Sequence, residues 1–230
     1  LRVCVVGAGS IGREFALHHF GPSTNTVVSS VIDVDFEAAR ALAADVGSVQ
    51  SGASVVGDSK YQATVSSCEG EPVATGVSLD ASALATCDIV YVGTPPASHR
   101  ALVLAALDAG KHVLLEKPMA STLDACERIL AAAARAGTVF MVAEQSHYWP
   151  DALKVREMIR DGTIGEVITA RAFFSSTADT LHGPKPWRYE HAKAGGGICM
   201  DGGAHWIRPL RMWLGEIDEV VAVIGHPLAK

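Results

Sequence analysis

One short segment near the amino terminus limits the folds open to this chain more than any other. Residues 3–6 are an unbroken apolar run, as expected for a strand that is buried on both faces. The pattern G-x-G-x-x-G follows at residues 7–12, and a helical pattern runs on to residue 19. The first glycine permits a tight turn, the second lets a pyrophosphate approach, and the third lets the helix pack against the strand. The segment therefore predicts a dinucleotide-binding turn, with a glycine turn of another α/β protein as the alternative. The expected contacts are Gly7, Gly9, Ser10, Ile11 and Gly12.

An acidic residue further along supports the same interpretation. Asp33 ends the next apolar run, about 20 residues on, where the acid that binds the ribose hydroxyls belongs. Its charge should repel a 2′-phosphate, and Val34 follows it where a site that prefers NADP would more naturally carry Arg or Ser. NAD is the expected cofactor. NADP is the alternative, because Arg40 on the next helix would reach a phosphate if that helix were rotated.

Composition excludes several classes of function. The net charge is −6 with no long run of Lys or Arg, which argues against a nucleic-acid partner. No apolar stretch is long enough to span a membrane, so no membrane partner is expected. The five cysteines are scattered and form no C-x-x-C pair, which suits a reducing compartment and predicts a cytoplasmic protein. The nine histidines show no ligand spacing, so we predict no catalytic metal.

The first half of the chain alternates short apolar runs with helical patterns. This alternation predicts an α/β fold of the Rossmann type, in which helices cover both faces of a doubly wound parallel sheet. After the first strand and helix, strands are expected at residues 27–32, 88–92, 111–115 and 138–142, and helices at 35–46, 98–109 and 123–136. Gly47 and Gly137 are expected to end two of the helices. Residues 47–80 fit a surface hairpin or a long loop equally well, and we assign them no function.

After residue 143 the pattern changes. A helix is expected at residues 151–161, a strand at 165–175, a loop at 182–193, a helix from about 199 to 214 and a strand at 219–224. This succession predicts an α+β domain with a mainly antiparallel sheet. We therefore divide the chain into a dinucleotide-binding domain, residues 1–146, and a second domain, residues 147–230.

Residues with useful chemistry follow the ends of several expected strands. In an open parallel sheet, ligands bind where the strands end, and Gly7, Asp33, Thr94 and Lys117 all come just after such ends. A buried lysine beside a nicotinamide can polarise or protonate a substrate oxygen. A surface lysine in a turn is the alternative for Lys117. His99 is expected to order the loop that precedes it.

A second set of candidates lies in the second half. Asp201 and His205 are four residues apart, so on one helix they would share a face, and histidine is the natural proton carrier near neutral pH. A purely structural pair is the alternative. Trp187 and Arg188 are candidates for one wall of a substrate pocket, or for a solvated loop pair.

Five motifs together resemble the Gfo/Idh/MocA oxidoreductase family, and the resemblance covers nearly the whole chain apart from residues 47–80. They are GAGSIG at 7–12, GTPPASH at 93–99, AGKHVLLEKP at 109–118, DGTIGEV at 161–167 and GGGICMDGGAH at 195–205. Within the family, the segment YWPDALKVREMI most resembles sugar and dihydrodiol dehydrogenases.

The resemblance implies a role for each residue that matches a family motif. Lys117, Asp201 and His205 would be catalytic, with the histidine as acid or base, the lysine assisting and Asp201 tuning both. Pro118 would follow a cis peptide bond. The remaining expected cofactor contacts are Thr94, Pro95, His99, Glu116 and Lys117, and the expected substrate contacts are Tyr148, Trp187 and Arg188.

The implied activity is hydride transfer between a nicotinamide cofactor and a secondary alcohol or ketone of a sugar, polyol or cyclic diol. A non-catalytic nucleotide-binding regulator and an NAD-dependent glycosidase are the alternatives. The second-domain sheet would also join subunits into a homodimer or a higher oligomer. Three departures stand out: Arg208 occupies a position where many members carry an acid, residues 47–80 are longer than usual, and family members run well beyond residue 230. The resemblance therefore implies an incomplete second domain, with a fragment, a truncated gene model and a short variant of the family as the alternatives.

Overall fold

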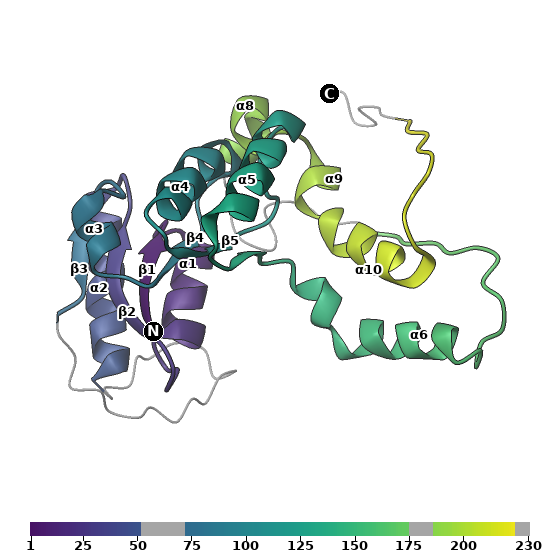
Figure 1. The fold of residues 1–230 in the computed structure, drawn as a ribbon, viewed down its shortest axis with the longest axis horizontal. Coiled ribbons are helices and arrows are strands. Elements are labelled where there is room, and N and C mark those ends of the chain that lie inside the picture. The colour runs from purple at the N-terminus through teal and green to yellow at the C-terminus, as the bar shows by residue number, and fades with distance from the viewer. Residues whose placement is uncertain (52–71, 175–185, 224–230) are drawn as a thin grey trace. The chain divides into compact units, whose positions relative to one another are not determined.

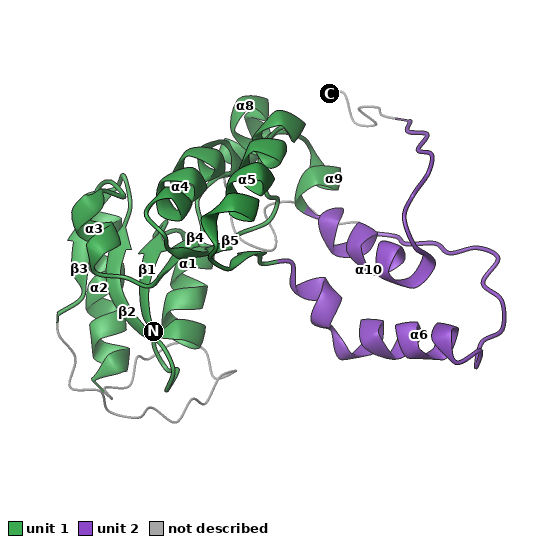
Figure 2. Ribbon diagram, in the orientation of Figure 1, with its two compact units in different colours: residues 1–143, 176–201 green, residues 144–175, 202–230 purple. Residues whose placement is uncertain are grey.

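The computed structural model describes residues 1–51, 72–174 and 186–223, and it divides into two compact units (Figure 2). Unit 1 comprises Leu1–Ala143 and Ser176–Asp201, and unit 2 comprises Glu144–Ser175 and Gly202–Lys230. The predicted domain boundary after residue 146 is not tested by this division and stays a prediction. No helix in the described ranges is long and apolar enough to cross a membrane.

Unit 1 is built on a six-stranded sheet in which every neighbouring pair is parallel (Figure 1). The strand order is β3-β2-β1-β4-β5-β6, the order of a Rossmann fold. This confirms the predicted fold class for the first domain. The strands are β1 (Arg2–Val6), β2 (Val27–Ile32), β3 (Ala74–Gly76), β4 (Ile89–Val92), β5 (His112–Leu115) and β6 (Phe140–Val142).

Helices connect these strands. They are α1 (Ser10–Phe15), which continues into a π-helical turn (Ala16–Phe20), then α2 (Phe36–Gln50), α3 (Ala81–Ala85), α4 (Pro96–Asp108) and α5 (Leu123–Ala136). The ends of α5 show why the sequence folds this way locally. The Thr122 side chain accepts a hydrogen bond from the Ala125 amide, and Gly137 ends the helix in the left-handed conformation, as predicted.

Both faces of the sheet are buried, because successive side chains of a strand point to opposite sides. Val3 and Val5 of β1 pack into one core with α2, whereas Cys4 and Val6 pack into the other with α4 and α5. In β4, Tyr91 lies in the first core and its neighbours Val90 and Val92 lie in the second. This two-sided burial explains the unbroken apolar runs in the sequence.

One expectation for the region after β2 was wrong. Helix α2 does not stop at Gly47 but runs on to Gln50, whose buried side chain bonds the backbone of Val28 in β2 at 2.6 and 3.3 Å. These bonds hold the last helical turn against the sheet. Near the end of the segment 47–80, residues Ala74–Gly76 form strand β3, which pairs with β2 and was not predicted. The hairpin or loop expected in that segment falls mostly on residues that the structure does not describe. Residues 52–71 lie outside the described residues.

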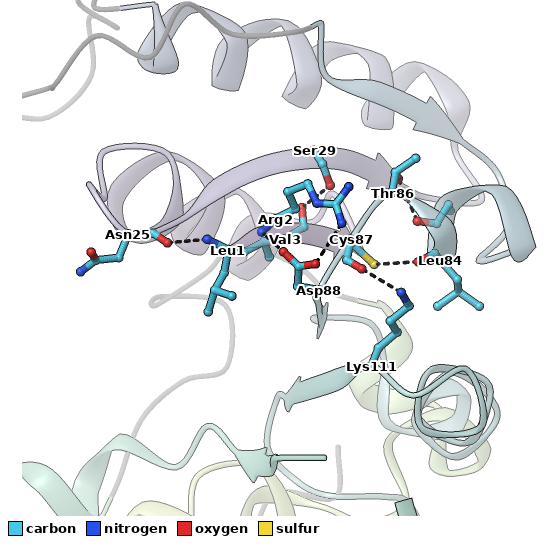
Figure 3. Close-up of polar contacts among 11 residues, drawn as sticks. Leu1, Arg2, Val3, Asn25, Ser29, Leu84, Thr86, Cys87, Asp88 and Lys111 are labelled. Atoms are coloured by element: carbon cyan, nitrogen blue, oxygen red, sulfur yellow. Dashed lines mark hydrogen bonds and ion pairs between the residues drawn. The ribbon is translucent and has the colours of Figure 1, made fainter. Parts of the chain in front are cut away.

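The edge of the sheet where the strands begin is held by a polar cluster (Figure 3). The Arg2 backbone amide and guanidinium donate to the two oxygens of Asp88, at 2.8 and 3.0 Å. Lys111 donates to the carbonyl oxygen of Cys87 at 3.0 Å. The cluster therefore ties the starts of β1, β4 and β5 together. Because Arg2 donates twice to Asp88, the pKa of this carboxyl falls from 3.8 to about 2.

This contact predicts a pH-dependent contribution to stability. A carboxyl with a lowered pKa in the folded state stabilises the protein above its unfolded pKa, and that contribution is lost as the pH falls toward about 2. Asp88→Asn should therefore lower the free energy of unfolding most at neutral pH and least in strong acid. Urea unfolding at a series of pH values measures this. An equal loss at every pH would contradict the assignment.

Unit 2 contains the short 3-10 helix η2 (Gln145–Tyr148) and the helices α6 (Pro150–Arg160) and α10 (Ala204–Leu214). The Trp213 indole on α10 donates to the carbonyl oxygen of Ala152 on α6 at 2.9 Å, which joins the two helices. The described residues 165–174 and 219–223 carry no strand. An extended segment counts as a strand only when its amide and carbonyl groups pair with a neighbour. The predicted antiparallel sheet therefore stays a prediction.

Candidate functional site

The loops predicted to carry the chemistry of unit 1 lie along one edge of the sheet. Gly7, Asp33, Thr94 and Lys117 follow the ends of β1, β2, β4 and β5. These four strands are adjacent in the sheet and all parallel, so their carboxyl ends meet at the same edge. The loops after β1 and β4 are in backbone contact, since a Cβ on Gly7 would lie 2.7 Å from the Gly93 carbonyl oxygen.

The three glycines of the first loop meet three different requirements. Gly7 has φ +105°, which side chains rarely tolerate, and a Cβ on Gly12 would lie 1.8 Å from the Gly7 carbonyl oxygen. A Cβ on Gly9, in contrast, would meet nothing within 4 Å. Gly7 and Gly12 are therefore needed by the protein's own packing, whereas Gly9 borders open space. Open backbone at this position is what a dinucleotide pyrophosphate requires, so the residues present fit the expected cofactor.

Asp33 is fixed beside this turn. Its Oδ2 accepts a hydrogen bond from the Ala8 amide at 2.7 Å, and its Oδ1 accepts one from the Asp35 amide at 2.9 Å. A carboxylate held between two backbone amides has a defined orientation, and its remaining lone pairs can accept from hydroxyl groups. Val34, which follows it, is 92% exposed. Arg40 pairs with Glu37 at 2.8 Å on the surface of α2.

His99 joins the loop after β4 to the loop after β5. Its Nε2 lies 2.7 Å from the carbonyl oxygen of Thr94, and its Nδ1 lies 3.0 Å from that of Pro118. The imidazole is fully buried, and this burial lowers its pKa. Any influence of His99 on a cofactor therefore passes through the loops that it holds. The peptide bond between Lys117 and Pro118 is cis, as the family resemblance implied.

The backbone of Lys117 is held by the residue before it. Glu116 is buried, and its carboxylate accepts hydrogen bonds from the Tyr91 hydroxyl at 3.2 Å and from the Lys117 amide at 3.1 Å. Burial, together with the charge of Glu116, raises the pKa of Tyr91, so this hydroxyl keeps its proton. Glu116 thus fixes the start of the loop that carries Lys117.

The side chain of Lys117 meets Asp201. Its Nζ donates to the backbone carbonyl of Asp201 at 2.8 Å and to Oδ1 at 3.1 Å, and only 16% of the side chain is exposed. The Nε of Arg188 lies 2.9 Å from the other oxygen, Oδ2. The carboxylate of Asp201 therefore lies between two cations, the ammonium of Lys117 and the guanidinium of Arg188. Its negative charge offsets the repulsion between them in this partly buried cluster. Of the predicted residues, the structure brings Lys117, Asp201 and Arg188 into one cluster within unit 1.

The expected single helix carrying Asp201 and His205 is broken. Asp201 ends the short helix α9 (Ile198–Asp201), two turn residues follow, and His205 lies in the first turn of α10. The helix is interrupted at Gly202 and Gly203, because glycine is unfavourable in a helix interior. Because of it, the two side chains do not share one helix face.

The imidazole of His205 has a carboxylate partner that the sequence analysis did not single out. Its Nδ1 lies 2.8 Å from Oε1 of Glu144, and both residues belong to unit 2. Burial on its own would raise the pKa of Glu144, but hydrogen bonds from His205 and from Ser146 outweigh it and lower the pKa to about 2. The only signal in the sequence was the position of Glu144 two residues after the last predicted parallel strand.

The remaining substrate candidates are arranged differently. Trp187 lies beneath Arg188, with the guanidinium carbon 5.2 Å from the ring centre. These two residues belong to η3 (Pro186–Tyr189), which with α8 (His191–Ala194) replaces much of the loop expected at residues 182–193; residues 182–185 lie outside the described residues. Tyr148 is largely exposed at the end of η2, in edge contact with His147. None of these placements tests a substrate role.

Comparison with known proteins gives matches along nearly all of the chain. The model of the Gfo/Idh/MocA oxidoreductase family, NAD-binding Rossmann fold, matches residues 1–144, and the model of the Gfo/Idh/MocA C-terminal domain matches residues 152–230. A 1,5-anhydro-D-fructose reductase from Ensifer adhaerens is 31% identical over 223 residues, which are 96% of this chain and 59% of that protein.

Solved structures of oxidoreductases are also similar to this chain. An aldose-aldose oxidoreductase from Caulobacter crescentus, complexed with glycerol, has a TM-score of 0.71 at 26% identity and covers 94% of this chain and 58% of its own. A 3-ketoreductase from Actinomadura kijaniata, in complex with NADP and TDP-benzene, has the same TM-score and identity, over 94% and 57%. The chain spans between half and two thirds of the length of these relatives. With the Rossmann strand order and the motifs above, these matches show that the chain belongs to the Gfo/Idh/MocA oxidoreductase family.

Proposed function

We propose that this protein is an NAD(P)-dependent oxidoreductase that acts on a secondary alcohol, or on the matching ketone, of a sugar, polyol or cyclic diol. The observation that carries the proposal is the position of Lys117. This lysine lies at the same strand edge as the open glycine turn, and its ammonium group is held in place by Asp201. Hydride transfer from an alcohol requires a protein that binds the cofactor and places a positive charge near the alcohol oxygen. The structure offers both at one edge of the sheet. The similarity of this chain to a reductase and a diol dehydrogenase of the family supports the proposed activity.

The chemistry divides among the three proposed catalytic residues. Lys117 places a positive charge where the alcohol oxygen becomes negative, and a fixed charge in a poorly solvated site stabilises such an oxygen strongly. His205 takes the hydroxyl proton in oxidation and returns it in reduction. Asp201 holds Lys117 and Arg188, and Trp187 and Arg188 form one wall of the substrate site with Tyr148 as a further contact. When bound, the nicotinamide ring supplies the hydride acceptor or donor.

Residues of unit 1 would hold the cofactor. The backbone of residues 7–12 binds the pyrophosphate, Asp33 the adenosine ribose, and the loop of Thr94 and Pro95 the nicotinamide side. Nothing in this arrangement needs a metal ion. NAD is preferred over NADP, because the fixed carboxylate of Asp33 would face a 2′-phosphate.

The cofactor preference gives a direct prediction. Asp33→Ser removes the charge that repels the 2′-phosphate, so the ratio of NAD to NADP affinity should fall by about 10-fold or more. Fluorescence titration with both reduced cofactors measures the ratio. Asp35→Ser is a matched control, because it removes the same charge two residues away and keeps a side chain that can cap α2. Equal or tighter binding of NADP by the unmutated protein would refute the preference.

Turnover with a panel of sugars, polyols and cyclic diols tests the proposed activity. Accumulation of reduced cofactor in the presence of one substrate class supports a dehydrogenase. Cofactor binding without turnover would instead indicate a regulator, and cleavage of glycosides without net cofactor reduction would indicate a glycosidase. The presence of both Lys117 and His205 favours an enzyme over a regulator.

The second domain carries further proposals. Residues 165–175 and 219–224 would form strands of a mainly antiparallel sheet in an α+β domain, residues 147–230, following the dinucleotide-binding domain, residues 1–146. That sheet would bind substrate on one face and a second subunit on the other, which gives a homodimer or a higher oligomer. The exposed apolar side chains of Ile168, Phe173 and Val221 support a covered surface there. Scattered cysteines support a cytoplasmic location.

A further inference from the structure

The imidazole of His205 has two nitrogens, and only one of them can take a proton from a substrate. In the neutral ring one nitrogen carries a hydrogen and the other carries a free lone pair. Which is which depends on the partner of each nitrogen. The partner of Nδ1 is therefore the group that decides what His205 can do, and that partner is Glu144, at 2.8 Å.

The protonation state of Glu144 settles the direction of this hydrogen bond. Its pKa of about 2 means that the carboxylate is ionised near neutral pH. An ionised carboxylate has no hydrogen to donate and can only accept. Nδ1 must therefore carry a hydrogen, and in the neutral ring Nε2 is then the nitrogen with the free lone pair.

Glu144 is itself held in place. The same oxygen that meets the imidazole also accepts a hydrogen bond from the Ser146 amide at 3.0 Å, where Glu144 caps the short helix η2. Only 13% of the Glu144 side chain is exposed, and its second oxygen, Oε2, is buried with no hydrogen-bond partner in the described ranges. A buried carboxylate oxygen without a partner costs free energy, and such a group in a native protein calls for an explanation, of which a catalytic role is one. Little water competes for this charge, so it acts mainly on His205.

We propose that Glu144 is a positioning residue that fixes His205 with its hydrogen on Nδ1, so that Nε2 accepts the substrate hydroxyl proton in oxidation and returns it in reduction. The inference rests on the proposed function of His205 as acid and base. It divides two tasks that the sequence analysis gave to one residue: Asp201 holds the cations of unit 1, and Glu144 holds the imidazole of unit 2.

The state of the ring can be tested without any substrate. The ¹⁵N chemical shifts of labelled histidine distinguish the two neutral forms, and the signal of His205 is identified by its loss in His205→Ala. We expect hydrogen on Nδ1 in the unmutated protein and a shift toward hydrogen on Nε2 in Glu144→Ala. The opposite form in the unmutated protein, or no change in the variant, would overturn the proposal, whatever the enzyme's activity.

Kinetics give the second test. Glu144→Gln keeps size and shape but removes the charge, and it should lower kcat on the order of 10- to 100-fold with little change in NAD affinity. Glu144→Asp should recover part of the loss seen in Glu144→Ala. Glu157→Gln is the matched control, since Glu157 lies on α6 and pairs with the exposed Lys154. A normal kcat in Glu144→Gln, alongside a large loss in His205→Ala, would overturn the role of Glu144 and leave the proposed function intact.

Discussion

Replacing Lys117 with methionine should lower kcat by about 100-fold or more while leaving NAD affinity nearly unchanged. Methionine keeps the length of the side chain and removes its charge. The loss follows because a fixed positive charge opposite a developing oxyanion is worth several kcal/mol in a poorly solvated site. The cofactor should still bind, because the glycine turn after β1 does not depend on the ammonium group of Lys117. Steady-state kinetics and a separate cofactor titration measure the two effects.

The same strand provides the control for this variant. Lys111 directly precedes β5 and donates to the Cys87 carbonyl (Figure 3). Lys117 follows the other end of that strand. Lys111→Met therefore makes the same chemical change at the opposite edge of the sheet and should leave kcat unchanged. Near-normal turnover by Lys117→Met would remove the proposed mechanism and leave a nucleotide-binding protein.

The proposed partnership with His205 adds a double-mutant test. His205→Ala should be about as severe as Lys117→Met, because each removes one of two groups needed in the same step. The combined variant should lose clearly less than the product of the two single losses, as residues that act as a unit do. A fully multiplicative loss would show that the two side chains act independently.

Two substitutions in the glycine turn should separate ligand binding from folding. Gly9 has φ −66° and ψ −178°, which a valine adopts without strain, and nothing lies within 4 Å of its added Cβ. Gly9→Val should therefore fold normally and weaken NAD binding on the order of 100-fold, because the side chain occupies the space for the pyrophosphate. Gly12→Ala should instead destabilise the fold by about 3 kcal/mol, since its Cβ would collide with the Gly7 carbonyl.

Thermal unfolding without ligand, followed by cofactor titration, distinguishes the two variants. The midpoint of unfolding should change little in Gly9→Val and fall in Gly12→Ala. If Gly9→Val bound NAD as well as the unmutated protein, the space beside this turn would not be the pyrophosphate site. If Gly12→Ala were as stable as the unmutated protein, the packing described for α1 would be wrong.

Most of unit 1 could be predicted, because its sheet is buried on both faces. An unbroken apolar run such as residues 3–6, followed by a glycine turn and a helical pattern, has few other structural meanings. Strand β3 was not predicted, because it lacks such an apolar run. It has three small residues, none of them buried, and among the described residues it pairs with β2 alone, so no apolar pattern in the sequence marks it.

The candidate site shows a similar limit. The sequence places chemistry-bearing residues after strand ends, and parallel pairing then brings those ends together, which is why the convergence of Gly7, Asp33, Thr94 and Lys117 was predictable. Partners within a pair are harder to predict. Asp201 is four residues from His205, but the turn at Gly202 and Gly203 breaks the helix between them. Glu144 is 61 residues from His205 in the sequence, and no spacing rule connects them.

The central position of β1 has a consequence for how the chain is made. This strand pairs with β2, which is synthesised soon after it, and with β4, whose first contact lies 86 residues away in the sequence. At typical rates of translation that interval lasts about 4–17 s. During it, the backbone groups of β1 that later bond β4 form an open edge flanked by apolar side chains, available to any other unpaired strand. This edge of β1 therefore stays open until β4 is available to pair with it.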